Sequence, residues 1–208
     1  MAASPNRIAT IGIATWLGFG ALAVAVTQGW TQHFDEAVLL ALRRGPAALN
    51  GPMIAITRLG ETWVREVLAA LGIVALLLYR RHADAAFLAL AALPAGLINT
   101  ALKLAFTRPR PSVVEHLVPA GGLSFPSGHA FGSTVLYLSL ALACAPLMRA
   151  QYRGALITLA LLLGALIAFS RAWLGVHYPS DVLAGWLGAV GWVLGCRMLV
   201  DRVGSIGR

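Results

Sequence analysis

Residues 154–181 read GALITLALLLGALIAFSRAWLGVHYPSD, and this stretch joins an apolar run to a polar cluster. The run from 154 to 170 carries no charged side chain. A helix needs roughly 17 to 25 such residues to cross the hydrocarbon core of a bilayer. The residues that follow include Arg171, His177 and Asp181. The stretch therefore predicts a membrane-spanning helix with ionisable side chains at one end.

The whole chain has the composition of a membrane protein. Of its 208 residues, 59% are hydrophobic and 12% are charged, and its mean hydropathy is +0.78, whereas soluble domains carry about 25% charged residues. Six apolar runs lie at residues 8–27, 62–79, 85–102, 130–148, 154–170 and 182–200. We therefore expect an all-α polytopic membrane protein: six transmembrane helices in one bundle, forming a single domain over residues 1–208.

Three details qualify this expectation. The run 62–79 is the weakest, because Arg65 and Glu66 interrupt it and have to pair or lie near the headgroups. The first run also fits a signal peptide, although no small-residue cleavage site clearly closes it, and an uncleaved helix is favoured. Cys144 and Cys196 fall inside apolar runs, which predicts packing roles rather than a disulfide or metal pair.

The connections between the runs alternate in character, which bears on orientation. Short basic connections, YRRHAD and RAQYR, follow runs two and four, whereas the other connections hold nearly all the Pro, Gly and acidic residues. This alternation favours an N-in, C-in topology. Lysine and arginine alone do not decide it, because each side then carries the same number of them. The balance becomes asymmetric only if Lys103, Arg108, Arg110 and Arg171 are set aside for a binding site.

The long connection 31–61 alternates charged and apolar residues at helical spacing. It predicts short helices lying in the membrane interface, broken at Gly45-Pro46 and Gly51-Pro52. Such helices either cap the bundle or contact the substrate. Within the third run, Pro94 and Gly96 predict a kink or close helix packing, and the glycines of the last run predict close packing.

Polar residues gather in three clusters at the outer ends of the predicted helices. The first cluster, in TALKLAFTRPRP (100–111), contains the only lysine of the chain, Lys103, together with Arg108 and Arg110. Lys103 alone fits a side chain that snorkels to the headgroups. With two guanidinium groups nearby, the cluster suits a tetrahedral phosphate better.

The second cluster, Pro126-Ser127-Gly128-His129, opens the fourth run. Ser127 is a good N-cap, Gly128 leaves its backbone N–H approachable, and the start of a helix attracts anions. An ordinary capped helix explains the first two residues equally well. A histidine immediately inside an apolar run is harder to explain that way, since ionisable groups at this depth usually have a function.

The third cluster contains His177 and Asp181, four residues apart, with Arg171 upstream. If the last helix has begun there, the carboxylate can fix the imidazole tautomer and leave the other ring nitrogen free as a nucleophile. A structural hydrogen bond is the alternative for this pair alone. Taken together, the three clusters supply cations for phosphate oxygens, a nucleophile and an acid, which is the inventory that phosphoryl transfer needs.

In order and spacing, the three clusters resemble the tripartite signature of the type 2 phosphatidic acid phosphatase superfamily. The matching residues lie between 103 and 181, and the rest of the chain is similar to small bacterial six-helix members. The resemblance implies a metal-independent phosphatase without a cofactor. In it His177 attacks phosphorus to form a phosphohistidine, Asp181 orients His177, and His129 protonates the leaving oxygen. The phosphate oxygens would be held by Lys103, Arg110, Ser127, the Gly128 amide and Arg171.

The resemblance implies a phospholipid or polyprenyl phosphate substrate, hydrolysed at the outer face of the bacterial cytoplasmic membrane. Undecaprenyl diphosphate, phosphatidylglycerophosphate, phosphatidic acid and lipid A phosphates are not separated by the sequence. A phosphotransferase of the same family and a non-enzymatic anion or lipid carrier are the alternative functions. Arg108 lies outside the motif and is a candidate second phosphate contact, while Glu115 and His116 are expected in a solvated loop.

The sequence does not favour nucleic acid as a partner or a metal as a ligand. The net charge is +8, but the arginines form no contiguous patch interleaved with aromatic residues. The five histidines and two cysteines are scattered without a ligand spacing. The oligomeric state is not determined by the sequence.

Overall fold

The computed structural model describes residues 5–206, and these residues form helices and loops without a β-strand. The helices are α1 (Pro5–Thr27), α2 (Gln32–Arg43), η1 (Ala47–Leu49), α3 (Asn50–Arg58), α4 (Thr62–Leu78), α5 (His82–Ala92), α6 (Ala95–Phe106), α7 (Gly128–Cys144), η2 (Ala145–Leu147), α8 (Ala150–Trp173) and α9 (Pro179–Ile206). The predicted all-α fold class is confirmed for the part of the chain described.

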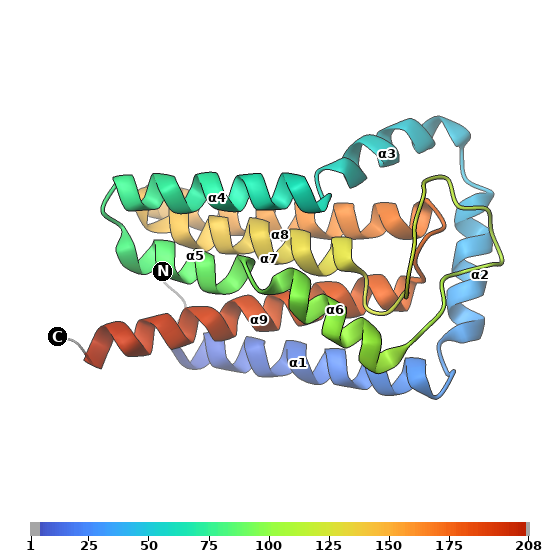
Figure 1. Ribbon diagram of the computed structural model, residues 1–208, viewed down its shortest axis with the longest axis horizontal. Helices are drawn as coiled ribbons and strands as arrows, with labels where there is room; N and C mark the ends of the chain where they lie inside the picture. The colour runs from blue at the N-terminus through green and yellow to red at the C-terminus, as the bar shows by residue number, and fades with distance from the viewer. Residues whose placement is uncertain (1–4, 207–208) are drawn as a thin grey trace.

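The long helices run side by side, and the short ones cover one end of them (Figure 1). α7 packs against both α8 and α9, α1 packs along α9, and α4 packs against α5. α1 begins and α9 ends at the same end of the bundle. The opposite end carries α2, which lies across it, together with α3 and the loop 107–127. That end is where the three polar clusters of the sequence fall.

Five helical segments among the described residues are long and apolar enough to cross a membrane: Asn6–Thr27, His82–Phe106, Gly128–Leu147, Ala150–Trp173 and Pro179–Gly204. They correspond to five of the six predicted runs. The remaining run forms α4, which has 17 residues and carries Arg65 and Glu66 in its second turn. A multi-pass membrane fold is thus confirmed.

The predicted kink in the third run is present. α5 ends at Ala92 and α6 begins at Ala95, with Pro94 immediately before it. A proline inside a helix has no N–H to donate and clashes with the preceding turn, so the helix breaks there. Gly96 does not mediate close helix packing, because a Cβ added to it would meet no atom within 4 Å.

Three glycines of α9 do pack closely, as the sequence predicted. A Cβ added to Gly185 would lie 2.8 Å from the carbonyl oxygen of Ser127, at the start of α7. Cβ atoms at Gly188 and Gly191 would meet the aromatic rings of Phe19 and Trp16 on α1. Small residues at these positions let α9 approach both neighbours closely, which is how helices gain packing energy in lipid.

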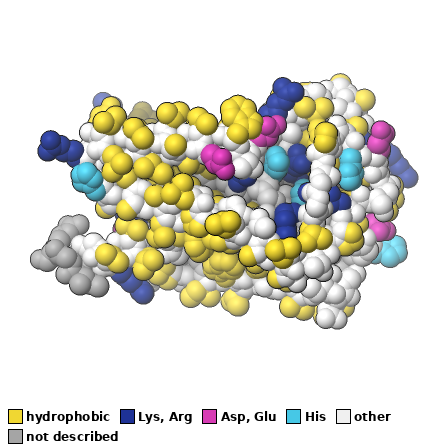
Figure 2. Space-filling model, in the orientation of Figure 1, with side chains coloured by type: hydrophobic (Ala, Val, Ile, Leu, Met, Phe, Trp, Pro, Cys, Tyr) yellow, Lys and Arg dark blue, Asp and Glu magenta, His cyan; other side chains and the backbone are white. Residues whose placement is uncertain are grey.

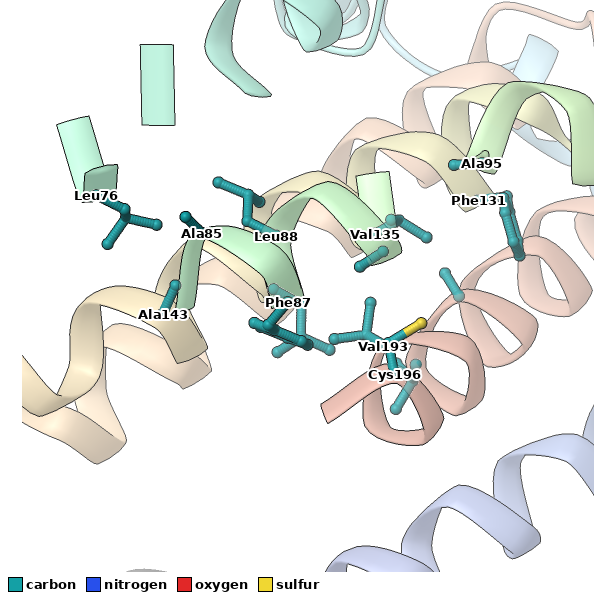
Figure 3. Close-up of a cluster of buried hydrophobic side chains, with 14 residues drawn as sticks. Leu76, Ala85, Phe87, Leu88, Ala95, Phe131, Val135, Ala143, Val193 and Cys196 are labelled. Atoms are coloured by element: carbon teal, nitrogen blue, oxygen red, sulfur yellow. The ribbon is translucent and has the colours of Figure 1, made fainter. Parts of the chain in front are cut away.

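The main hydrophobic core lies where α5, α7 and α9 meet (Figure 3). Phe87, Leu88 and Val193 are fully buried there, and Cys196 contributes its thiol as an apolar group. Both cysteines are free, which agrees with the predicted packing role. Large hydrophobic side chains also cover much of the outer surface, as expected for helices that face lipid.

The connection 31–61 forms the short helices that were predicted, but one break is wrong. α2 ends at Arg43, just before Gly45-Pro46. Gly51-Pro52 instead lies in the first turn of α3. Proline is tolerated there because the first N–H groups of a helix have no acceptor within the helix.

Candidate active site

The three polar clusters converge at the end of the bundle covered by α2. Arg110 of the first cluster contacts His177 of the third, and the Ser127 N–H of the second donates to the carbonyl of Asp181 at 3.1 Å. Figure 2 shows basic and histidine side chains gathered around a hollow toward this end, on a surface otherwise rich in hydrophobic side chains. Residues that are far apart in the chain thus form one site.

His177 lies in the turn before α9, with only 2% of its surface exposed. Its Nδ1 lies 3.5 Å from Asp181 Oδ2 and 3.2 Å from Ser124 Oγ. Its Nε2 lies 3.1 Å from the Nη1 of Arg110. With Nδ1 bearing the proton toward Asp181, as this network indicates, Nε2 keeps its lone pair on the side of Arg110.

The His177–Asp181 contact was predicted, but the helical reason for it was wrong. α9 begins at Pro179, so only Asp181 is helical. Proline favours the first helical position, where its fixed φ suits the helix and no N–H is needed. Asp181 Oδ2 then accepts a hydrogen bond from the Tyr178 N–H at 3.0 Å and another from Ser124 Oγ. These bonds hold the carboxylate beside the imidazole.

Burial lowers the pKa of His177 to about 3, with the charges of Arg110 and Lys103 adding to the effect and Asp181 opposing it. Burial in a poorly solvated site disfavours the charged imidazolium. The imidazole is therefore neutral at neutral pH. A neutral ring with an unprotonated Nε2 is the form that can act as a nucleophile.

Arg110 is aimed at His177 by backbone carbonyls. Its Nη1 donates to Val176 O at 2.7 Å, and its Nη2 donates to Gly121 O at 2.8 Å. Burial lowers the pKa of this guanidinium, with Asp181 opposing the effect. No carboxylate lies within ion-pair distance of Arg110 among residues 5–206. Its charge is thus available to an anion placed at Nε2 of the imidazole.

Lys103 also faces the site rather than the headgroups. It lies in the last turn of α6, and its ammonium donates to the carbonyls of Leu123 and Ser124. The chain reverses at Thr107, which has a left-handed φ of 49° and lets the following loop fold back over this lysine. The single lysine is therefore held beside the loop that carries Ser124 to His177.

The start of α7 has the geometry that the second cluster predicted. Ser127 is the N-cap, and its Oγ accepts a hydrogen bond from the Ala130 N–H at 3.4 Å. A Cβ on Gly128 would lie 2.9 Å from Asn99 Oδ1, so glycine here also permits the close approach of α6. His129 follows in the first turn, partly exposed. The helix N-terminus therefore faces the hollow with its amides and an imidazole.

Arg171 lies in the last turn of α8, buried. Its Nη1 donates to Thr57 Oγ1 at 2.8 Å, and its Nε has no partner. It makes no ion pair with the carboxylates described between residues 5 and 206. A buried guanidinium without a counter-ion is costly, so an anionic ligand is its expected partner.

Arg108 occupies a different place from the one considered for it. Its Nη1 donates to Asp181 Oδ1 and Ser180 Oγ, both at 2.7 Å, and its Nη2 donates to Asp35 Oδ2 at 2.8 Å. Its guanidinium carbon lies 4.0 Å from the centroid of the Tyr178 ring. These partners saturate Arg108, so it serves as a buried link rather than as a second phosphate contact.

Asp35 is the residue at this site that the sequence did not reveal. It is fully buried on α2 and accepts from the Ser180 N–H at 2.9 Å and from Ser180 Oγ at 2.6 Å, in addition to Arg108. One signal was available in the sequence: Asp35 precedes Leu39 by four residues, so the two side chains share one face of a helix. The structure buries both. An acidic residue on the buried face of a capping helix needs a buried cation.

The other residues of the loop behave as expected. Glu115 has an exposed side chain and contributes only its backbone carbonyl, which accepts from Arg43. His116 Nε2 lies 2.8 Å from Pro111 O and so stays within the loop. Among residues 5–206, no three His, Cys, Asp or Glu side chains are placed to share a metal ion.

Comparison with known proteins decides the family. The model of the PAP2 superfamily matches residues 84–204. The chain belongs to the PAP2 superfamily. The match covers all three clusters of the site, and the resemblance predicted from their spacing is confirmed.

Individual PAP2 relatives agree with this assignment. The chain is 31% identical over 180 residues to phosphatidylglycerophosphatase B of Bacillus subtilis, covering 84% of this chain and 87% of that protein. It is 40% identical over 101 residues to undecaprenyl-diphosphatase BcrC of Bacillus subtilis, covering 46% and 48%. These PAP2 proteins are named phosphatases, and the predicted enzyme class is confirmed.

The fold agrees with a solved PAP2 structure. The crystal structure of the transmembrane PAP2-type phosphatidylglycerolphosphate phosphatase from Bacillus subtilis superposes with a TM-score of 0.82 at 28% identity. The superposition covers 95% of this chain and 97% of that one. The helical arrangement described above is therefore that of a transmembrane PAP2 enzyme.

Proposed function

We propose that this protein is a metal-independent lipid phosphatase that cleaves the headgroup phosphate or diphosphate of a membrane lipid through a phosphohistidine. The observation that carries the proposal is the geometry of His177. Its Nδ1 faces a buried carboxylate, while its Nε2 faces Arg110 at the site where three clusters meet. A nucleophile oriented in this way, beside cations that have no carboxylate partner, is the arrangement that phosphoryl transfer requires.

In the proposed binding step, the phosphate takes a place between His177 and the cations around it. Arg110, Lys103 and Arg171 neutralise its oxygens, and the N-terminus of α7 contributes the Ser127 side chain and the Gly128 amide. Two of the arginines lack a carboxylate partner among the described residues. Charges that gain their counter-ion only from the substrate are placed to stabilise the charge that develops in the transition state.

In the proposed chemical step, His177 Nε2 attacks phosphorus and the bond from phosphorus to the leaving oxygen breaks. His129 gives its proton to that oxygen, and Asp181 stabilises the positive charge that develops on His177. Water then attacks the phosphohistidine, with His129 taking the proton, and inorganic phosphate is released. His129 thus acts as a general acid in the first step and as a general base in the second, while His177 carries the phosphoryl group.

A lipid substrate is supported by the position of the site. It lies at one end of a bundle whose outer surface carries large exposed hydrophobic side chains, so a headgroup can reach it while its chain stays in the membrane. The names of the relatives include a phosphatidylglycerophosphatase and an undecaprenyl-diphosphatase. A phospholipid or polyprenyl phosphate is accordingly the proposed substrate class.

The proposed topology has six spans, with α4 as the second and both chain ends in the cytoplasm. α4 alternates in direction with its neighbours as a sixth span has to (Figure 1). Four of the basic residues at the α2 end, Lys103, Arg108, Arg110 and Arg171, belong to the site or are buried beside it. With these four committed to the site, the remaining basic residues favour the opposite end as cytoplasmic. The site then faces the exterior of a bacterial inner membrane, within one domain of residues 1–208.

The direct test is phosphate release by the purified protein in detergent. Phosphatidic acid, phosphatidylglycerophosphate and undecaprenyl diphosphate are supplied separately, with EDTA present and His177→Asn as the control variant. Release that persists in EDTA and that the substitution abolishes is the expected result. Binding of the lipids with no release from any of them contradicts hydrolysis and favours the carrier. Phosphorylation of a second acceptor without release of inorganic phosphate favours a phosphotransferase.

A further inference from the structure

Arg65 is a cation that the site as described does not use. It lies in the second turn of α4 and donates one hydrogen bond, from Nη2 to Thr62 Oγ1 at 3.0 Å. Its Nε is buried without a partner. No carboxylate lies within ion-pair distance of it among residues 5–206. Of the two alternatives expected for Arg65 and Glu66, pairing or a position near the headgroups, the pair is not formed.

The guanidinium of Arg65 lies against α7, one turn from His129. A Cβ added to Gly132 would lie 1.3 Å from Arg65 Nη1 and 2.4 Å from its Cζ. Only a glycine leaves room for the guanidinium at this point. Gly132 follows His129 by three residues, so one helical turn, about 5 Å, separates their positions along α7.

A hydroxyl without a partner lies at the same place. Ser133 is fully buried, and its Oγ makes no hydrogen bond. A Cβ added to Gly60 would lie 2.8 Å from Ser133 Oγ and 2.9 Å from His129 Cδ2, so Gly60 packs closely against both and covers the hydroxyl. Arg65, Ser133 and Arg171 thus carry unsatisfied polar atoms around His129. Buried polar groups of this kind are costly unless a ligand or water completes them.

This position lies on the membrane side of His129, where the lipid part of a substrate has to leave. α7 begins at the site end, so residues after His129 lie progressively deeper. Tyr137, Leu140 and Cys144 continue the same face of α7 at helical spacing and line an apolar groove of about 230 Å³ between α7 and α8. The groove is lined almost entirely by apolar groups, which suits part of a hydrocarbon chain.

We propose that Arg65 forms a second phosphate subsite, which holds the phosphate that stays on the lipid when a lipid diphosphate is cleaved. The proposal rests on the proposed phosphatase function and specifies its substrate class. The terminal phosphate lies at His177, the bridging oxygen at His129, and the retained phosphate one turn deeper at Arg65. An ion pair with that phosphate supplies the counter-ion that Arg65 lacks within the protein.

The reaction balances without any further reactant. His177 Nε2 forms a bond to the terminal phosphorus while the bond from that phosphorus to the bridging oxygen breaks. The electron pair stays on the bridging oxygen, which takes the proton of His129, and the lipid monophosphate leaves with Arg65 as its counter-ion. Water then displaces His177 from phosphorus and returns a proton to His129. One diphosphate and one water give one lipid monophosphate and one inorganic phosphate.

Two substrates with the same chain separate this role from a structural one. Farnesyl diphosphate and farnesyl monophosphate differ only in the second phosphate, so we compare kcat/KM for both in wild type and in Arg65→Gln. The expected loss on the diphosphate is about 10- to 100-fold, and it exceeds the loss on the monophosphate at least tenfold. Arg58→Gln is the matched control, because Arg58 is exposed on α3 at the same end and should show no such difference between substrates.

A binding measurement keeps the test decisive if turnover fails. Methylenediphosphonate should raise the unfolding temperature of wild type more than methylphosphonate does, and Arg65→Gln should remove that difference. Equal losses on both farnesyl substrates, or an unchanged preference for methylenediphosphonate, would overturn the subsite. Absence of phosphate release from both substrates by wild type, with diphosphonate binding that depends on Arg65, would instead reject the phosphatase and leave the subsite standing.

Discussion

At the scale of single residues, the site combines contacts between neighbours in the sequence with contacts between distant segments. Ser127 as an N-cap and the contact between His177 and Asp181 follow from local sequence, because both partners lie within four residues. Arg108 and Asp35 are separated by 73 residues. Their ion pair depends on the packing of α2 across the bundle, and no local pattern encodes it.

The burial of His177 affects how the free energy of unfolding depends on pH. Its pKa is lowered to about 3 in the folded protein, whereas an unfolded histidine titrates near 6.5. The unfolded chain therefore binds a proton that the folded chain does not, and stability should fall as the pH drops from about 6.5 toward 3. His177→Asn removes this contribution, so its unfolding temperature should depend less on pH than that of wild type.

Thermal unfolding in one detergent between pH 5 and 7.5 measures this difference. His33→Asn, at an exposed position on α2, is the matched control and should keep the slope of wild type. Identical slopes for wild type and His177→Asn would contradict the burial of a neutral imidazole.

At the scale of elements, helices were easier to predict than the contacts between them. The break at Pro94 and the end of α2 before Gly45-Pro46 follow from backbone chemistry. The location of Gly51-Pro52 inside the first turn of α3 does not, since proline is compatible both with a break and with a helix start. The docking of α2 on α9 depends on the buried side chain of Asp35. A hydropathy scale scores aspartate as polar, so it predicts an exposed position and not this contact.

Asp35→Asn tests whether α2 positions the carboxylate of Asp181. The substitution removes the negative charge that Arg108 and Ser180 bind. Asp181 is then the remaining carboxylate paired with Arg108, and its position beside His177 should shift. We expect kcat to fall about tenfold with little change in KM, together with a loss of about 3 kcal/mol in unfolding free energy. Glu115→Gln is the control for charge, because the Glu115 side chain is exposed at the same end of the molecule. A wild-type kcat in Asp35→Asn would show that α2 is a passive cover.

At the scale of the whole molecule, hydropathy predicted the membrane bundle but not its orientation. The runs are long and apolar, and five of them return as helices able to cross a membrane. Orientation depends on which basic residues are free to face the cytoplasm. That distinction needs the structure, because Arg108 and Arg171 are buried while other arginines are exposed.

Labelling of single cysteines measures the orientation. In a Cys144→Ser, Cys196→Ser background, Ser112→Cys lies in the exposed loop at the site end, and His82→Cys lies exposed at the opposite end. A membrane-impermeant maleimide should modify Ser112→Cys in intact cells and His82→Cys only after permeabilisation. The reverse pattern would place the site in the cytoplasm.

Trapping the intermediate tests most directly whether His177 carries the phosphoryl group. The purified protein is mixed with a lipid whose terminal phosphate is radiolabelled, and the reaction is quenched with alkali within the first turnover. A phosphohistidine survives alkali and is lost in acid, unlike a phosphoserine. If His177 is the nucleophile, wild type carries label that is stable in alkali, is lost in acid and maps to His177, and His177→Asn carries none. Equal labelling of His177→Asn, or phosphate release by wild type at full rate with no labelled protein, would contradict a phosphohistidine at His177.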